Sequence, residues 1–202
     1  SHNVRVRGTS ATAGFGGHVM VMACCDMMPT GFGRFSNVEL TEMGQKQILG
    51  RYPMHWHMVR ENGAGQYLRD SSVHQTHNRA ITIHGSHQVT VERNVCFDVM
   101  GHAVFLEDGV ERDNRILGNL VLATRKPGAC DQMLPHDRSL DQPQNRTPAA
   151  FWISHPDNEF VGNVAADSLG VGYWFALHRF PTGLSSTQPW IGSFSDLVGG
   201  VW

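Results

Sequence analysis

The sequence has no long apolar run and carries little charge. No apolar stretch reaches the roughly 18 residues that a membrane-spanning helix requires, so the sequence predicts no membrane span. Charged residues make up 17% of the 202 positions, and the formal net charge is −2. Because nucleic acids and anionic membranes attract strongly basic surfaces, this balance argues against either as the main partner.

Cysteine is also scarce, and no pair has the C-x-x-C spacing, which excludes a zinc finger or a thioredoxin-like motif. The four cysteines are Cys24, Cys25, Cys96 and Cys130. The adjacent Cys24 and Cys25 cannot easily bridge each other. One of them could pair with Cys130, and the sequence leaves both this pairing and the redox compartment open.

Helical periodicity is hard to find. The chain consists instead of short apolar runs separated by Gly, Asn, Asp and His, and it contains 22 glycines. Short runs bounded by turn residues are typical of strands, and abundant glycine suits a fold with many tight turns. The sequence therefore predicts an all-β protein.

Two series of motifs recur along the chain at a nearly constant interval. In the first, the polar members are 24, 25 and 44 residues apart: Asp70, Asn94, Asn119 and Asn163. In the second, a strand-like run ends in histidine or glutamate, with intervals of 27, 23, 48 and 23 residues: His57, His84, Glu107, His155 and His178. Each roughly doubled interval spans one extra unit plus a loop. A strand-rich repeat of about 25 residues is what one coil of a parallel β-helix requires.

We therefore expect a right-handed single-stranded parallel β-helix of roughly seven to eight coils. It would form one domain over residues 1–202, with an inserted loop at about 126–148, and the chain can be a segment of a longer protein. Asn94, Asn119 and Asn163 should form an internal ladder at one turn. Leucine-rich repeats share the period, but their consensus is absent, and a β-sandwich stays open as an alternative.

Histidine is unusually abundant, with twelve residues in the chain. In a parallel coil, equivalent residues lie about 4.8 Å apart on successive strands, so His57, His84 and Glu107 should converge. His55 shares a face with His57, His18 could align with His55, and His155 and His178 would extend the column. The predicted metal ligands are His18, His55, His57, His84, Glu107, His155 and His178. Imidazole and carboxylate favour a divalent transition metal, zinc first, with copper, iron, manganese or nickel open; a histidine ladder without metal is the alternative.

The chain resembles the β-helical region of the cell-migration-inducing and hyaluronan-binding protein family, which includes the transmembrane hyaluronidase. The resemblance rests on segments in the same order over most of residues 1–185. They are Phe15-Gly16-Gly17-His18, Glu42-Met43-Gly44-Gln45, Arg51-Tyr52-Pro53-Met54-His55-Trp56-His57, Thr82-Ile83-His84-Gly85, Gly101-His102 with Phe105-Leu106-Glu107-Asp108-Gly109, Leu134-Pro135 with Asp137-Arg138, Phe151-Trp152-Ile153-Ser154-His155-Pro156 and Phe175 to His178.

This resemblance implies a parallel β-helix, a secreted or extracellular setting, and binding or depolymerisation of hyaluronan. The chain shows no signal-peptide pattern, and we interpret it as a mature or trimmed sequence. It is far shorter than the animal members and lacks their later cysteine spacing in the loop from Lys126 to Pro148. A microbial relative with another glycan substrate stays open.

We expect a metal-dependent enzyme that degrades hyaluronan-like or other uronate-containing polysaccharides, as a hydrolase or a lyase. The candidate catalytic residues are Glu107, Asp108, Asp137 and Arg138, for proton transfer or for binding the uronate carboxylate. The candidate substrate-binding residues are Arg51, Trp56 and Arg179. Arg60 and Arg79 could likewise pair with uronate carboxylates, and Trp152, Tyr173 and Trp174 could stack on sugars. The alternatives are a non-catalytic glycan-binding or structural module and a histidine-ligated copper or iron oxidoreductase. The sequence leaves the oligomeric state open.

Overall fold

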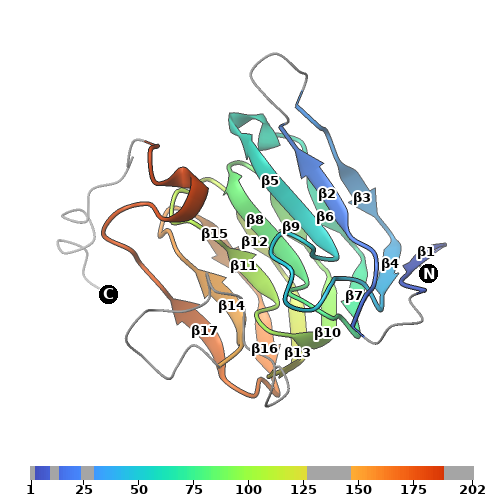
Figure 1. Cartoon of the computed structure of the whole chain (residues 1–202). Helices are drawn as coiled ribbons and strands as arrows, with labels where there is room; N and C mark the ends of the chain where they lie inside the picture. Colours follow the sequence, from blue (N-terminus) through green and yellow to red (C-terminus); the bar gives the residue numbers. More distant parts are fainter. Residues whose placement is uncertain (1–2, 10–13, 24–29, 127–146, 189–202) are drawn as a thin grey trace.

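A computed structural model describes residues 3–9, 14–23, 30–126 and 147–188, which form a stack of short strands (Figure 1). The strands make three sheets of six, six and five members, and every hydrogen-bonded pair of strands is parallel. Each sheet takes one strand from each successive turn of the chain. This arrangement is a parallel β-helix, which confirms the expected fold class.

The strands of each sheet follow one another along the stack. The first sheet contains β1 (Val4–Arg7), β4 (Val38–Thr41), β7 (Ser72–His74), β10 (Val95–Met100), β13 (Leu120–Arg125) and β16 (Val164–Ala166). The second contains β2 (Val19–Met22), β5 (Met54–Arg60), β8 (Ile81–Ser86), β11 (Val104–Leu106), β14 (Ala149–Ile153) and β17 (Val171–Phe175). The third contains β3 (Arg34–Ser36), β6 (Tyr67–Arg69), β9 (Thr90–Glu92), β12 (Arg115–Leu117) and β15 (Glu159–Val161).

Only short 3-10 turns, such as η1 (Glu61–Gly63) and η4 (Gly183–Ser185), interrupt the strands, and the described residues contain no α-helix. None of the helical segments described here is long and apolar enough to cross a membrane. Six-stranded sheets correspond to six coils in the described residues, whereas roughly seven to eight were expected for the whole chain. The expected insertion at 126–148 falls between β13 and β14, and its residues 127–146 lie outside the described residues.

Alternate residues of each strand face the interior, which gives the stack one continuous apolar core. Met54, Ile81, Val104 and Phe151 align on successive strands of the second sheet, and all four are completely buried. The intervals between these aligned residues are 81 − 54 = 27, 104 − 81 = 23 and 151 − 104 = 47. The coil length predicted from the sequence is therefore close to the one observed.

An asparagine ladder runs inside one turn, as the sequence predicts. The Asn94 backbone and side-chain amides each donate to Asn119 Oδ1 at 3.0 Å, and Asn119 donates to Asn163 Oδ1 in the same way at 2.9 and 3.0 Å. One coil earlier the aligned residue is Ser71, whose backbone amide donates to Asn94 Oδ1 at 3.1 Å, so Asp70 stands one residue outside the ladder. A second ladder, from Asn114 to Asn158, was not predicted.

The Asn119 side chain should be essential for stability. Replacing it with leucine removes the acceptor for both Asn94 amides and leaves buried donors unsatisfied, so we expect a loss of about 2–4 kcal/mol in the free energy of unfolding. Urea denaturation of Asn119→Leu measures this loss. Arg115→Ala removes only an exposed ion pair with Glu159 and should cost under about 1 kcal/mol. An Asn119→Leu variant as stable as Arg115→Ala would contradict the ladder's role.

Candidate metal site

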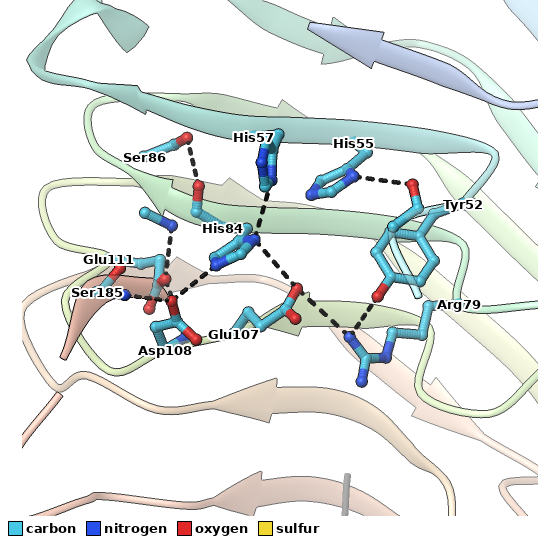
Figure 2. A network of polar contacts seen from close by, with 12 residues as sticks. Tyr52, His55, His57, Arg79, His84, Ser86, Glu107, Asp108, Glu111 and Ser185 are labelled. Carbon is cyan, nitrogen blue, oxygen red and sulfur yellow. Dashed lines mark hydrogen bonds and ion pairs between the residues drawn. The ribbon is translucent and has the colours of Figure 1, made fainter. Parts of the chain in front are cut away.

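Three histidines meet on the outer face of the second sheet (Figure 2). His55 and His57 are two residues apart on β5 and so share a face, with ring centroids 5.0 Å apart. His84 lies opposite His57 on β8, with ring centroids 4.8 Å apart, and its ring is parallel to that of His55 at 6.0 Å. Because Trp56 and Ile83 between them point into the core, the sheet's alternation itself turns these imidazoles outward.

The ligand atoms form two groups of three that share His84, each compact enough for a metal ion. His57 Nδ1 and His84 Nδ1 are 3.1 Å apart, and His84 Nδ1 is 3.7 Å from Glu107 Oε2. Two nitrogens on one tetrahedral zinc ion, each about 2.0–2.1 Å from it, lie roughly 3.3–3.4 Å from each other, which is close to the separation of the two imidazole nitrogens. One ligand atom from each of His55, His57 and His84 lies within 4.8 Å of the others, as is also true of His84, Glu107 and Asp108.

The tautomer of His55 also suits metal binding. Its Nδ1 lies 3.1 Å from the carbonyl oxygen of Gly50, and because a carbonyl only accepts, this nitrogen carries the proton. Nε2 is then left with a lone pair, and it is a buried atom without a hydrogen-bond partner. Burial and the neighbouring imidazoles lower the pKa of His55 well below its usual value, which keeps the ring neutral and able to bind a cation.

His84 is held by a carboxylate on its other side. Its Nε2 donates to Asp108 Oδ2 at 2.7 Å, and the backbone amide of Ser185 donates to the same oxygen at 3.0 Å. Burial alone would lower the pKa of His84, but the hydrogen bond to Asp108 and the nearby carboxylates outweigh it and raise the pKa. Burial would raise the pKa of Asp108, but His84 and Ser185 outweigh that effect and lower it. The pair therefore favours an ionised Asp108.

The Glu107 carboxylate forms an ion pair with the buried guanidinium of Arg79. Arg79 is 1% exposed, and its Nη1 lies 3.5 Å from Glu107 Oε2 and donates to Tyr52 Oη at 3.0 Å. The guanidinium also stacks 3.6 Å from the ring centre of Phe105. Sequence reasoning grouped Arg79 with possible uronate-binding arginines. The repeat could have predicted that Arg79 lies beside Tyr52 on the neighbouring coil, since Tyr52 precedes His57 and Arg79 precedes His84 by the same five residues.

Glu111 fixes the loop that carries Asp108, and no motif or repeat in the sequence pointed to it. It is completely buried and accepts backbone amides from Gly85, Asp108, Gly109 and Val110 at 2.8–3.2 Å. Burial raises the pKa of Glu111, and these amide donors oppose that effect. The carboxylate thus ties the end of β8 to the loop after β11.

The site holds three buried carboxyl groups and one buried guanidinium. Glu107, Asp108 and Glu111 are at most 6% exposed, and Arg79 is the one buried arginine or lysine among the described residues. A buried charge loses its hydration by water. Burial is therefore costly unless an opposite charge or hydrogen bonds compensate for that loss. With the carboxylates ionised, a divalent cation would balance this difference.

The structure brings together four of the seven predicted ligands, His55, His57, His84 and Glu107, and separates three others. Val19 aligns with Met54, so His18 lies opposite Pro53 rather than His55, and Arg51 donates to its Nε2 at 2.6 Å. The expected alignment of His18 is therefore wrong.

The predicted extension of the column by His155 and His178 is also wrong in register. Phe105 aligns with Trp152 and Trp152 with Trp174, so the residues that follow Glu107 in its column are Ser154 and Ala176. His155 is one residue beyond this column, which turns its side chain away, and its Nδ1 accepts from the Asp157 amide. His178 is two residues beyond Ala176.

The predicted substrate-binding residues fall in different environments. Arg51 and Arg179 are exposed, as an arginine that meets a glycan must be. Trp56 is completely buried and donates to Gln66 Oε1 at 3.1 Å, so its ring offers no surface to a sugar, and this assignment is wrong. The candidate catalytic residues Asp137 and Arg138 lie outside the described residues.

Removing Arg79 should destabilise the metal-free protein strongly. Arg79→Met leaves the buried Glu107 carboxylate without its cation, a change that costs roughly 3–5 kcal/mol. Thermal and urea unfolding in the presence of a chelator measure this loss. Arg51→Met, at an exposed position, is the matched control and should change stability by under about 1 kcal/mol. Equal stability of the two variants would show that Glu107 does not depend on Arg79.

Comparison with known proteins confirms the resemblance seen in the sequence motifs. The chain is 37% identical over 171 residues to Fibrocystin-L of Mus musculus, covering 85% of this chain and 4% of that protein. It is 36% identical over 195 residues to Cell surface hyaluronidase CEMIP2 of Homo sapiens, covering 85% and 13%. It is 40% identical over 176 residues to a G8 domain-containing protein of Dictyostelium discoideum, covering 83% and 11%. It thus spans only a small part of the length of these relatives. Since the model of the CEMIP beta-helix family also matches residues 14–195, the chain belongs to that family.

Proposed function

We propose that this β-helix is a metal-dependent module that degrades hyaluronan-like or other uronate-containing polysaccharides. The metal would be a divalent transition metal, zinc first, bound by His55 Nε2, His57 Nδ1 and His84 Nδ1, with Glu107 Oε2 beside His84 as the further candidate ligand. The observation that carries the proposal is the meeting of three imidazoles, with Glu107 beside His84, in a site with three buried carboxyl groups and one buried arginine. Imidazole nitrogen and carboxylate oxygen together are a donor set that zinc prefers.

When bound, such a metal supplies a Lewis acid that can activate water or neutralise a uronate carboxylate. The chain's own residues orient and expose the site. His57 is only half-buried, whereas His55 and His84 are at most 5% exposed, so substrate would approach from the side of His57. Asp108 accepts hydrogen bonds from His84 and Ser185, which suits orientation better than proton transfer.

The proposed substrate class rests on the relatives and on exposed cations. One relative is named as a cell surface hyaluronidase, which motivates both a hyaluronan-like substrate and an extracellular setting for this chain. Arg51 is exposed and directly follows Gly50, whose carbonyl oxygen accepts from His55 Nδ1. Its guanidinium could pair with a uronate carboxylate.

A second candidate is a non-catalytic glycan-binding or structural module in which the metal only joins neighbouring coils. The burial of the site favours it, since Glu107 is 6% and His55 is 1% exposed, and structural zinc sites are closed. The two candidates share the same ligands and differ in turnover.

The metal site predicts one bound metal ion per chain. We expect zinc titration and elemental analysis to show this stoichiometry, and His84→Ala to abolish it, because His84 belongs to both groups of ligand atoms. Metal at a concentration 100 times its Kd should add about 2.7 kcal/mol to stability. The control is His74→Ala, since His74 hydrogen-bonds Glu39 on the first sheet. Equal metal content in wild type and His84→Ala would rule out this site.

Catalysis predicts loss of polymer viscosity on hyaluronan, chondroitin or pectin. We expect His57→Ala and a chelator each to abolish cleavage, and the folded coil to remain, because His57 is at the half-buried edge of the site. New reducing ends alone would indicate hydrolysis, and an additional ultraviolet absorbance from unsaturated uronate would indicate a lyase. Metal-loaded protein that leaves every polymer intact would support the structural module instead.

A further inference from the structure

After the last strand, the chain returns across the stack to the metal site. It leaves β17 at Phe175 and forms the turn η4 beside the loop that follows β11, two strands earlier in the second sheet (Figure 1). We call residues 182–185 the strap. Ser185 is completely buried although the strap lies at the surface of the coil, so the strap is packed against the protein and is not a loose loop.

The strap's contacts converge on one residue, Asp108. The backbone amide of Thr182 donates to the Asp108 carbonyl oxygen at 2.8 Å, and that of Ser185 donates to Asp108 Oδ2 at 3.0 Å. The same Oδ2 accepts from His84 Nε2 at 2.7 Å (Figure 2). The strap and His84 are therefore linked through a single carboxylate oxygen.

Gly183 permits this close approach. Its φ of +54° is in the left-handed region, and a Cβ placed on it would lie 2.3 Å from Asp108 Oδ1 and 3.0 Å from Asp108 Cγ. Any side chain at position 183 would push the carboxylate away from its present position. The strap thus fits Asp108 in two ways. The Ser185 amide donates to the carboxylate, and Gly183 leaves room for it because it has no side chain.

We propose that the strap is a positioning element of the metal site: it fixes Asp108, and Asp108 fixes His84 with its proton on Nε2 and its Nδ1 turned to the metal. This inference rests on the metal site proposed above. Carboxylates that orient a ligating histidine in this way typically contribute 10–100-fold to metal affinity. Asp108 is then a positioning residue and not a proton donor to the substrate.

The test introduces a side chain at position 183 of the full chain. Gly183→Ala should lower zinc affinity about 10–100-fold, measured by competition with a fluorescent chelator. Gly118→Ala is the matched control, because Gly118 also has a positive φ, of +60°, while its nearest atom to an added Cβ is Arg93 Cγ at 3.7 Å. Both variants carry similar backbone strain, and only one disturbs Asp108.

Two further measurements separate positioning from a general loss of stability. Nitrogen-15 NMR of the metal-free protein should show the His84 proton on Nε2 in wild type and in Gly118→Ala, with this signature altered in Gly183→Ala. In an Asp108→Ala background, where the clash is gone, Gly183→Ala should reduce zinc affinity no further. Additive losses in that double variant would overturn the proposal.

Failure of this inference can be distinguished from failure of the metal site. If wild type binds zinc and Gly183→Ala binds it equally well, the strap does not position the site, although the site itself stands. If wild type binds no transition metal, the proposed function fails, and the NMR signature of His84 still decides whether the strap sets its tautomer. An unchanged signature in Gly183→Ala would overturn the positioning role in either case.

Discussion

The parallel register between coils is the constraint on which the structure depends. It places equivalent residues of successive coils about 4.8 Å apart, so a polar residue repeated at the coil period meets its own copies. Inside the turn, Asn119 accepts from Asn94 and donates to Asn163, because an amide side chain can do both. Outside the sheet, the same spacing brings His57 to His84, and two imidazoles need a proton or a metal between their nitrogens. One geometry thus produces a structural ladder and a candidate site.

The sequence predicted the centre of the site because that part obeys the period without interruption. His57, His84 and Glu107 are separated by 27 and 23 residues, which matches the observed intervals between core residues of the same strands. The prediction failed beyond the insertion, where the observed interval is 47 rather than 48 residues. A slip of one residue is invisible in the sequence but moves His155 out of the column, because successive side chains of a strand point to opposite faces.

Other parts of the site have no periodic signal at all. Ser185 reaches Asp108 across 77 residues, and Glu111 binds amides on two different coils through its own side chain. Such contacts depend on where a loop closes in space, which coil length does not determine. Arg79 is different, since it lies in register with Tyr52, but a buried arginine is so unusual that sequence reasoning placed it on the surface.

The arrangement of the aromatic rings bears on which glycans the coil could recognise. Trp152 is stacked between Phe105 at 5.6 Å and Trp174 at 5.3 Å, with interplanar angles of 21° and 22°. A ring that covers its neighbours with both faces leaves only an edge for a sugar, so Trp152 is unsuited to the stacking expected for it. Recognition would then depend on the exposed ring of Tyr173, on exposed cations such as Arg51 and Arg179, and on the metal, and the cations and the metal favour anionic over neutral sugars. The exposed cations, and not the packed rings of the second sheet, therefore favour a uronate-containing glycan as the proposed substrate.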